Sequence, residues 1–240
     1  MNIDLNEIEF SPIFRKDISD KVRNLFKEEL NKFNKLYSIF SDLDRFLVSK
    51  CNRKDNYSKE YFTRIFNIRI KDHFSSAIIL VSQGFNVDAI SLTRSALEDL
   101  FVILNFYLDK NYFDKWKINK NNFTIKPKEL RNNKNIKTED KTLYKNVYKA
   151  LSNIVHPKKE SILHMLKFHP TVVNEGVVGI NAIKKDINLI NIAFYVYIYQ
   201  VSSMLKSIYK SNKDSITLKC IIDKLLKVDI IEDFMNPNLG

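Results

Sequence analysis

The amino-acid sequence predicts an all-α protein, folded as a single bundle of about six helices in one domain that spans residues 1–240. Three observations support this fold class. Apolar residues recur every three or four positions through most of the chain, which is the spacing of one helix face. The 4 Gly and 5 Pro residues are too few for an all-β fold, which turns about every 8–12 residues. A hydrophobic content of 45% is enough for an ordered core.

The first two helices are predicted from long amphipathic patterns. Apolar side chains recur every three or four residues from Asp17 to about Lys50, which predicts one long helix. A polar break at 52–58 separates it from a second helix over 59–83. Gly84 follows directly, and glycine is the residue that most easily adopts the left-handed conformation of a helix C-cap. We therefore expect the second helix to end there.

The third helix is predicted to lie in the centre of the bundle. It begins at Asn86 or Asp88, either of which can cap a helix N-terminus, and it reaches about Leu108. Residues 100–104 are all apolar, as in a helix that is buried all round. The next stretch, 109–141, is rich in Lys and Asn and is longer than an ordinary helix connection, so we predict a variable polar insertion there. Its role as a lid or a partner-binding segment stays open.

The second half of the chain carries the remaining helices. A fourth helix, over 141–155, places Tyr148 on its apolar stripe. Pro157 disfavours helical geometry at the preceding residue, so His156 is expected at or just past the end of this helix. The bundle is completed by a short helix over 160–168, a very hydrophobic helix over 181–210 and an amphipathic helix over 217–234.

The charge of the chain favours an anionic partner. Its formal net charge is +11 and its pI is about 9.4, and a basic surface lowers the cost of approaching phosphate. The lysines are spread along the whole chain without an arginine-rich cluster, so a merely solvated basic surface is the alternative.

The sequence also predicts a cytoplasmic protein without a membrane partner. Cys51 and Cys220 lie far apart in the chain and form no CxxC motif, which is typical of a reducing compartment. Residues 1–12 are acidic and polar, unlike a secretory signal. The longest apolar run, 189–201, is interrupted by two amide side chains and falls short of the ~20 residues that cross a bilayer.

One candidate site begins with Arg94 and Glu98 on the third helix. Their i, i+4 spacing sets both side chains on one face of an otherwise largely apolar helix. An arginine held by a carboxylate can bind an anion such as phosphate. The alternative is a structural ion pair inside the bundle or a solvated polar stripe.

The second part of the site is predicted on the fourth helix, where Lys149, Ser152 and His156 follow one helical edge. Histidine suits proton transfer because its ordinary pKa is the closest to neutrality. The alternative is a histidine that caps the last carbonyls of its helix. Serine hydrolysis lacks a Gly-rich nucleophile elbow here, and the only helical pair for a metal, Glu160 and His164, has no HExxH pattern. We therefore predict no metal and no cofactor.

These motifs resemble a known family. The order Arg94-x3-Glu98, a variable insertion, and then Tyr148-x2-Leu-Ser152-x2-Val-His156-Pro157 is similar to a bacterial all-helical family of unknown function, over roughly residues 60–205. More distantly it resembles HEPN-type helical proteins. Their signature is an Arg and a His separated by four to six residues and pooled between the two protomers of a dimer. Here six residues separate Lys149 from His156, with Lys at the Arg position.

The resemblance implies an RNA-directed effector, a metal-independent endoribonuclease of the toxin or phage-defence type, that forms a homodimer. In this hypothesis His156 is the general acid or base, Lys149 and Arg94 stabilise the charge on phosphate, and Glu98, Ser152 and Tyr148 support them. RNA is then the expected partner, together with an antitoxin or another protein. Two alternatives stay open: a non-catalytic helical interaction module with a structural Arg/Glu/His network, and a simple nucleic-acid-binding protein.

Overall fold

The computed structural model describes residues 16–51, 57–118, 128, 132–136, 138–155 and 178–230, and every regular element in this part of the chain is a helix. The predicted all-α fold class is confirmed. Eight helices of four residues or more are described, where about six were predicted. They are α1 (Lys16–Leu25), α2 (Lys27–Lys50), α3 (Lys59–Ser82), α4 (Asn86–Leu108), α5 (Tyr112–Ile118), α7 (Thr138–Val155), α10 (Val178–Ile208) and α11 (Asn212–Leu226).

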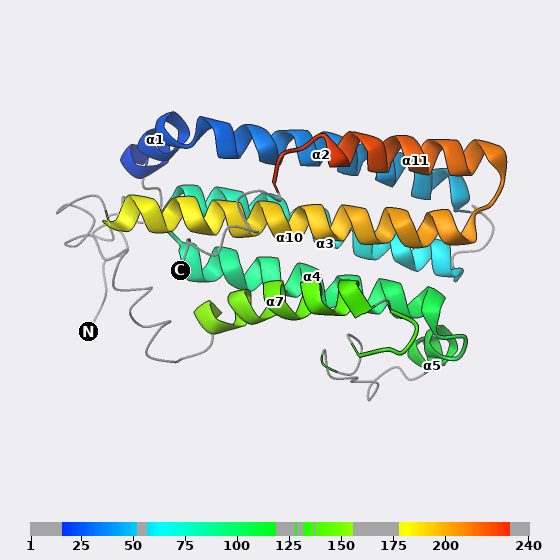
Figure 1. The fold of residues 1–240 in the computed structure, drawn as a ribbon. Coiled ribbons are helices and arrows are strands. Elements are labelled where there is room, and N and C mark those ends of the chain that lie inside the picture. The colour runs from blue at the N-terminus through cyan, green and yellow to red at the C-terminus, as the bar shows by residue number, and fades with distance from the viewer. Residues whose placement is uncertain are drawn as a thin grey trace, which may run out of the picture.

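The long helices lie side by side along one direction (Figure 1). In this view α2 and α11 form the upper layer, α3 and α10 the middle layer, and α4 and α7 the lower layer. Consecutive helices α3 and α4 form an antiparallel hairpin that turns at Gly84, whose φ of 83° only glycine adopts without strain. The predicted C-cap is confirmed.

The central element is α10, which packs against α2, α3, α4, α7 and α11. Because neighbours surround it, its buried positions run almost without interruption through residues 186–198. Phe194 stacks on Phe74 of α3 with ring centroids 4.4 Å apart. The long apolar pattern is therefore that of a core helix. In the part of the chain that the structure describes, no helix is both long and apolar enough to cross a bilayer.

The first predicted helix is two helices. The pattern over 17–50 predicted one continuous helix, but the backbone departs from helical geometry at Phe26, where φ is −116° and ψ is 34°. The hydrogen bonds on either side continue, from Phe26 N–H to Val22 O (2.9 Å) and from Leu30 N–H to Phe26 O (3.0 Å). The bend keeps Val22 and Phe26 buried while α1 contacts α3 as well as α2. Tertiary packing thus overrides a uniform sequence pattern.

Other helix boundaries also differ from the prediction. Helix α7 begins at Thr138, three residues before the predicted start. Helix α11 begins at Asn212, five residues before it, because the Ser211 side chain caps the helix by accepting a hydrogen bond from Asp214 N–H (3.3 Å). It ends at Leu226, eight residues before the predicted end. The predicted short helix over 160–168 lies outside the described residues.

The start of the predicted insertion belongs to the bundle. Residues 112–118 form α5, and its Trp116 ring lies against Phe62, Phe66 and Phe106 with centroids 5.0, 5.9 and 5.0 Å away. Aromatic contacts of this kind stabilise beyond simple area burial. This part of the predicted 109–141 insertion therefore packs on the bundle through its aromatic side chains. Residues 119–127, 129–131 and 137 lie outside the described part.

A buried hydrogen-bonded network links α2, α3 and α10. The Asn67 amide donates to the Asp44 carboxylate (2.9 Å), and the Tyr197 hydroxyl donates to the Asn67 carbonyl oxygen (2.5 Å). Asn67 and Tyr197 are fully buried, and burial raises the pKa of Tyr197 well above its ordinary value. The phenol therefore stays neutral and acts as a donor.

Replacing Tyr197 with Phe should destabilise the fold. The Tyr197→Phe variant leaves the Asn67 carbonyl oxygen buried without its donor, at a cost of about 1–3 kcal/mol in the free energy of unfolding. Urea denaturation followed by circular dichroism measures this change. Tyr195→Phe is the matched control, because Tyr195 is a buried tyrosine of the same helix whose hydroxyl makes no hydrogen bond within the described residues. Equal losses in both variants would contradict the prediction.

Candidate functional site

Helices α4 and α7 run antiparallel and bring the two halves of the predicted site together (Figure 1). The Phe101 ring of α4 lies 5.5 Å from Tyr144 and 6.2 Å from Tyr148. These contacts fix the register, so that Tyr148 lies beside the turn of α4 that carries Arg94 and Glu98. Residues about fifty positions apart in the chain thus meet in one interface.

Arg94, Glu98 and Tyr148 are joined by hydrogen bonds, which we call the Arg–Glu–Tyr network. Arg94 Nε donates to Glu98 Oε1 (3.2 Å) and to the Tyr148 hydroxyl oxygen (3.1 Å). The Tyr148 hydroxyl in turn donates to Glu98 Oε1 (2.6 Å). The guanidinium carbon lies 5.1 Å from the Tyr148 ring centroid, within the range of a cation–π contact. The network therefore ties α4 to α7 through polar and aromatic contacts together.

The network is only partly shielded from solvent. The Arg94 and Glu98 side chains are 22% and 34% exposed, and Tyr148 is 9% exposed. Burial raises the pKa of Tyr148, as does its hydrogen bond to Glu98, while Arg94 lowers that pKa. The phenol is thus neutral at pH 7. It serves as a donor to the carboxylate, which sets the direction of every hydrogen bond in the network.

The other predicted residues do not join the Arg–Glu–Tyr network. Lys149 lies on the exposed face of α7, together with Lys145, Asn146 and Asn153. The Ser152 hydroxyl oxygen is buried one turn beyond Tyr148 and has no hydrogen-bond partner in the described part of the chain. His156 lies outside the described residues, as do Glu160 and His164. The structure therefore places Lys149 and the network on different faces of the same helix.

A second arginine–carboxylate pair, which the sequence analysis missed, lies next to the network. Asp99 directly follows Glu98, and its Oδ2 is 3.1 Å from Arg69 Nε of α3 in the geometry of an ion pair, not of a hydrogen bond. Burial raises the pKa of Asp99 to about 6, Arg69 lowers it, and Glu98 raises it. The sequence shows Asp99 on the largely apolar third helix, which indicates that this carboxylate needs a cation. The spacing of residues within that helix does not identify Arg69 as the cation.

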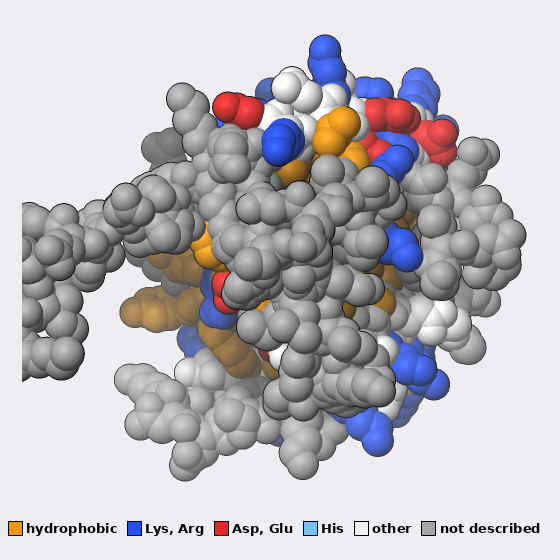
Figure 2. All heavy atoms as spheres, turned by 90° about the vertical axis from the view of Figure 1, so that its left-hand side faces the viewer, with side chains coloured by type: hydrophobic (Ala, Val, Ile, Leu, Met, Phe, Trp, Pro, Cys, Tyr) orange, Lys and Arg blue, Asp and Glu red, His pale blue; other side chains and the backbone are white. Residues whose placement is uncertain are grey.

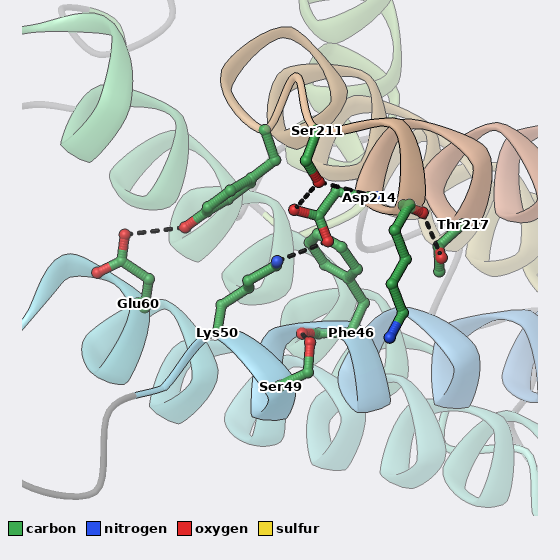
Figure 3. A network of polar contacts seen from close by, with 9 residues as sticks. Phe46, Ser49, Lys50, Glu60, Ser211, Asp214 and Thr217 are labelled. Carbon is green, nitrogen blue, oxygen red and sulfur yellow. Dashed lines mark hydrogen bonds and ion pairs between the residues drawn. The ribbon is translucent and has the colours of Figure 1, made fainter.

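A third polar network lies at the other end of the bundle, where α2 ends and α11 begins (Figure 3). Lys50 Nζ is 2.6 Å from Asp214 Oδ1 and lies over the rings of Phe46 and Tyr209, 5.2 and 5.1 Å from their centroids. The Ser211 hydroxyl donates to the second Asp214 oxygen (2.7 Å). Its charged groups satisfy one another, so this network holds helix ends together.

A groove of about 670 Å³ runs beside this third network between α2 and α11. Its rim carries Arg45 and Lys224, and both contact the same Asp42 carboxylate. Both cations of the groove are therefore in ion pairs with Asp42. Within the described residues no group of three or more His, Cys, Asp or Glu side chains could hold a metal ion.

The end of the bundle at which α7 ends and α4 and α10 begin is shown in Figure 2. Lys and Arg side chains lie around its rim, with hydrophobic side chains between them.

Comparisons with protein-family models, with curated proteins and with solved structures give no match to this chain. The functional argument therefore rests on the residues and their geometry.

Removing Arg94 should destabilise the protein more than removing an exposed arginine. The Arg94→Ala variant leaves the Glu98–Tyr148 pair without its cation, which should lower the free energy of unfolding by about 1–2 kcal/mol. Arg45→Ala is the matched control, because its side chain is 77% exposed and also pairs with one carboxylate through a helical turn. It should cost less than about 0.5 kcal/mol. Urea unfolding of both variants is the measurement, and equal losses would contradict the structural role of the network.

The raised pKa of Asp99 should make stability depend on pH. A carboxyl whose pKa is about 6 in the folded state and 3.8 ordinarily favours folding while it is protonated. This contribution is complete below about pH 4 and is lost as the pH rises through about 6. Relative to Asp99→Asn, the wild type should therefore lose up to about 3 kcal/mol of unfolding free energy between pH 4 and pH 7.

Urea unfolding of both proteins across this pH range measures the effect. Asp223→Asn, which removes an exposed carboxylate of α11, is the control for the loss of one surface charge. A wild-type to Asp99→Asn difference that stays constant with pH would contradict the assignment.

Proposed function

We propose that the chain is an RNA-directed effector of the HEPN type, a metal-independent endoribonuclease that acts in toxin or phage-defence systems. One observation carries the proposal: α7 presents a basic exposed face with Lys149 and is held on α4 by the Arg–Glu–Tyr network behind that face. The chain continues from the end of α7 at Val155 directly into His156. In the sequence, six residues separate Lys149 from His156, the two residues to which this proposal assigns the chemistry.

The charge of this region supports RNA as the substrate. The exposed face of α7 carries Lys145 and Lys149 with two asparagines and no acidic side chain among its exposed described residues. Lys and Arg side chains also lie on the rim of the same end of the bundle, with Asp and Glu side chains among them (Figure 2). Such a face attracts phosphates at long range and gains affinity by releasing counterions. Asparagine side chains add hydrogen bonds to phosphate and sugar.

The proposed reaction is an internal transfer on RNA. The ribose 2′-hydroxyl attacks the adjacent phosphorus, the O2′–P bond forms and the P–O5′ bond breaks. His156 accepts the 2′-hydroxyl proton or protonates the leaving 5′-oxygen, and Lys149 stabilises the charge that develops on the phosphoryl oxygens. The products are a 2′,3′-cyclic phosphate and a 5′-hydroxyl. This chemistry uses no metal and no cofactor.

In this proposal Arg94 is a positioning residue. Its Nε already binds Glu98 and Tyr148, so it fixes α7 on α4 and adds positive charge behind Lys149. Ser152, whose hydroxyl oxygen is buried without a partner in the described part of the chain, has a supporting role in this proposal. A homodimer would pool two such helix ends around one RNA, with an antitoxin or another protein as a further partner.

The second candidate is a non-catalytic helical interaction module. It is favoured by the mutual bonding of the Arg–Glu–Tyr network, in which each of the three side chains bonds to the other two. A satisfied network between two helices specifies register and orientation without chemistry. The two candidates differ in one measurable property, which is cleavage of RNA.

Cleavage of RNA should depend on His156 and Lys149. We expect the purified chain to cut single-stranded RNA in the presence of EDTA and to leave 2′,3′-cyclic phosphate ends. His156→Ala should lower the rate by about 100-fold or more, because proton transfer contributes 10²–10⁴-fold. Lys149→Ala should lower it by a similar factor.

His169→Ala and Lys219→Ala are the matched controls and should cut like the wild type. Circular dichroism verifies that each variant is folded, and growth of cells induced for each protein reports toxicity. A wild type that leaves RNA intact in vitro and in cells, or a fully active His156→Ala, contradicts the proposal and favours the interaction module.

A further inference from the structure

Two consecutive carboxylates of α4 face in different directions and each holds an arginine. Successive residues of a helix are rotated by about 100° from one another, so Glu98 faces α7 and Asp99 faces α3. Between the two pairs, the small residues Ser91 and Ser95 form the half-exposed ridge of α4, with their hydroxyls bonded back to the helix. A low ridge flanked by two guanidinium groups is a surface along which an extended anion can lie.

Arg69 is the more open of the two arginines. Its side chain is 58% exposed, while Asp99 beneath it is only 9% exposed. The closest contact of the ion pair is made by Nε, and neither Nη atom donates a hydrogen bond in the described part of the chain. The two Nη groups form the edge of the guanidinium that binds phosphate with two parallel hydrogen bonds.

Asp99 contributes little to the free energy of unfolding, but it holds the guanidinium of Arg69 in one orientation. Its carboxylate is desolvated and is compensated by a half-exposed cation, which is an unfavourable way to bury a charge. A burial that raises the pKa of a carboxyl means that the folded state resists its ionisation. What the pair provides is a fixed orientation of an exposed guanidinium, as in sites that recognise anions.

His73 lies one turn beyond Arg69 on the same helix. The i, i+4 spacing places both side chains on one face of α3. Its Nδ1 is a buried atom without a hydrogen-bond partner in the described part. Burial and the charge of Arg69 lower the pKa of His73, so the ring is neutral at pH 7. A neutral imidazole beside a guanidinium can share a phosphate or ribose hydroxyl.

We propose that Arg69, positioned by Asp99, and His73 form a binding subsite for the RNA backbone on the α3–α4 face. It rests on the proposed function for the choice of RNA as the ligand. The subsite lies across the α4 ridge from the Arg–Glu–Tyr network, so one strand can contact Arg69 and the exposed face of α7. The cations Arg45 and Lys224 of the groove between α2 and α11 form no comparable subsite, because both are bound to Asp42.

Binding of an RNA that cannot be cleaved tests this proposal. The probe is a fluorescein-labelled single-stranded RNA with every 2′-hydroxyl methylated, and fluorescence anisotropy gives the Kd at several salt concentrations. Arg69→Ala should weaken binding about tenfold and lower the slope of log K against log salt by about one. Arg45→Ala removes the same charge from α2, where Arg45 pairs with Asp42, and it should change the Kd less than about twofold.

The Asp99→Asn variant separates positioning from charge. Removing a negative charge should strengthen RNA binding by simple attraction, whereas loss of a positioned guanidinium weakens it. We expect Asp99→Asn to weaken binding about two- to threefold with an unchanged salt slope. His73→Ala should behave in the same way at pH 7.5, because the ring that it removes is neutral.

Each outcome supports or overturns the subsite. Equal effects of Arg69→Ala and Arg45→Ala, tighter binding by Asp99→Asn, or no binding by the wild type would overturn it. Displacement of the RNA by inorganic phosphate, at concentrations too low for an effect of ionic strength, would indicate a site for small anions. Such competition would also overturn the RNA subsite. Because the probe cannot be cut, a chain that binds through Arg69 but never cleaves RNA contradicts the proposed catalysis and leaves the subsite standing.

Discussion

The rest of the structure depends on the burial of α10. This helix is apolar nearly all round, and five other helices cover it. Burying a polar side chain costs free energy unless it is hydrogen-bonded, and several polar groups of α10 bond to neighbouring helices. Asn86 of α4 donates to Asp186, Asn191 donates to the backbone oxygen of Glu29 (2.9 Å), and Tyr197 donates to Asn67. These bonds set the position of α2, α3 and α4 along α10. Hydrophobic burial supplies the attraction, and the buried polar groups select one register.

The packing of helices around α10 also decides which part of α4 stays near solvent. Held by α3 and α10 on two sides and by α7 on a third, α4 keeps only a narrow ridge near solvent. Beyond the first turn of this helix, its two acidic side chains lie where an arginine from the same or a neighbouring helix reaches them. These are Glu98 and Asp99, on opposite sides of the ridge. A mostly buried helix therefore also carries two arginine–carboxylate pairs near the candidate site.

The polar networks differ in how far their charged side chains are exposed to solvent. The Lys50–Asp214 network is closed by charge pairing, ring contacts and a helix cap, which accounts for all of its charged groups. The three side chains of the Arg–Glu–Tyr network bond to one another and are partly exposed. Arg69 is more open, since its side chain is 58% exposed and donates no hydrogen bond in the described part of the chain. Open donors beside a buried carboxylate are what distinguish an anion subsite from a structural ion pair.

The sequence by itself determined the all-α fold and the limits of α4, which follow from the periodicity of apolar residues. It also determined the turn at Gly84 after α3 and the pairing of Arg94 with Glu98, which depend on contacts within one or two helical turns. It did not show the break at Phe26 or the docking of Trp116 on Phe62 and Phe106, which depend on neighbours distant in the chain. The partner of Asp99 lies thirty residues away on α3, and the hydroxyl of Tyr148 meets Arg94 only because α7 packs antiparallel to α4. Helical spacing is local information, whereas the choice of which faces meet is made by the packing of the whole bundle around α10.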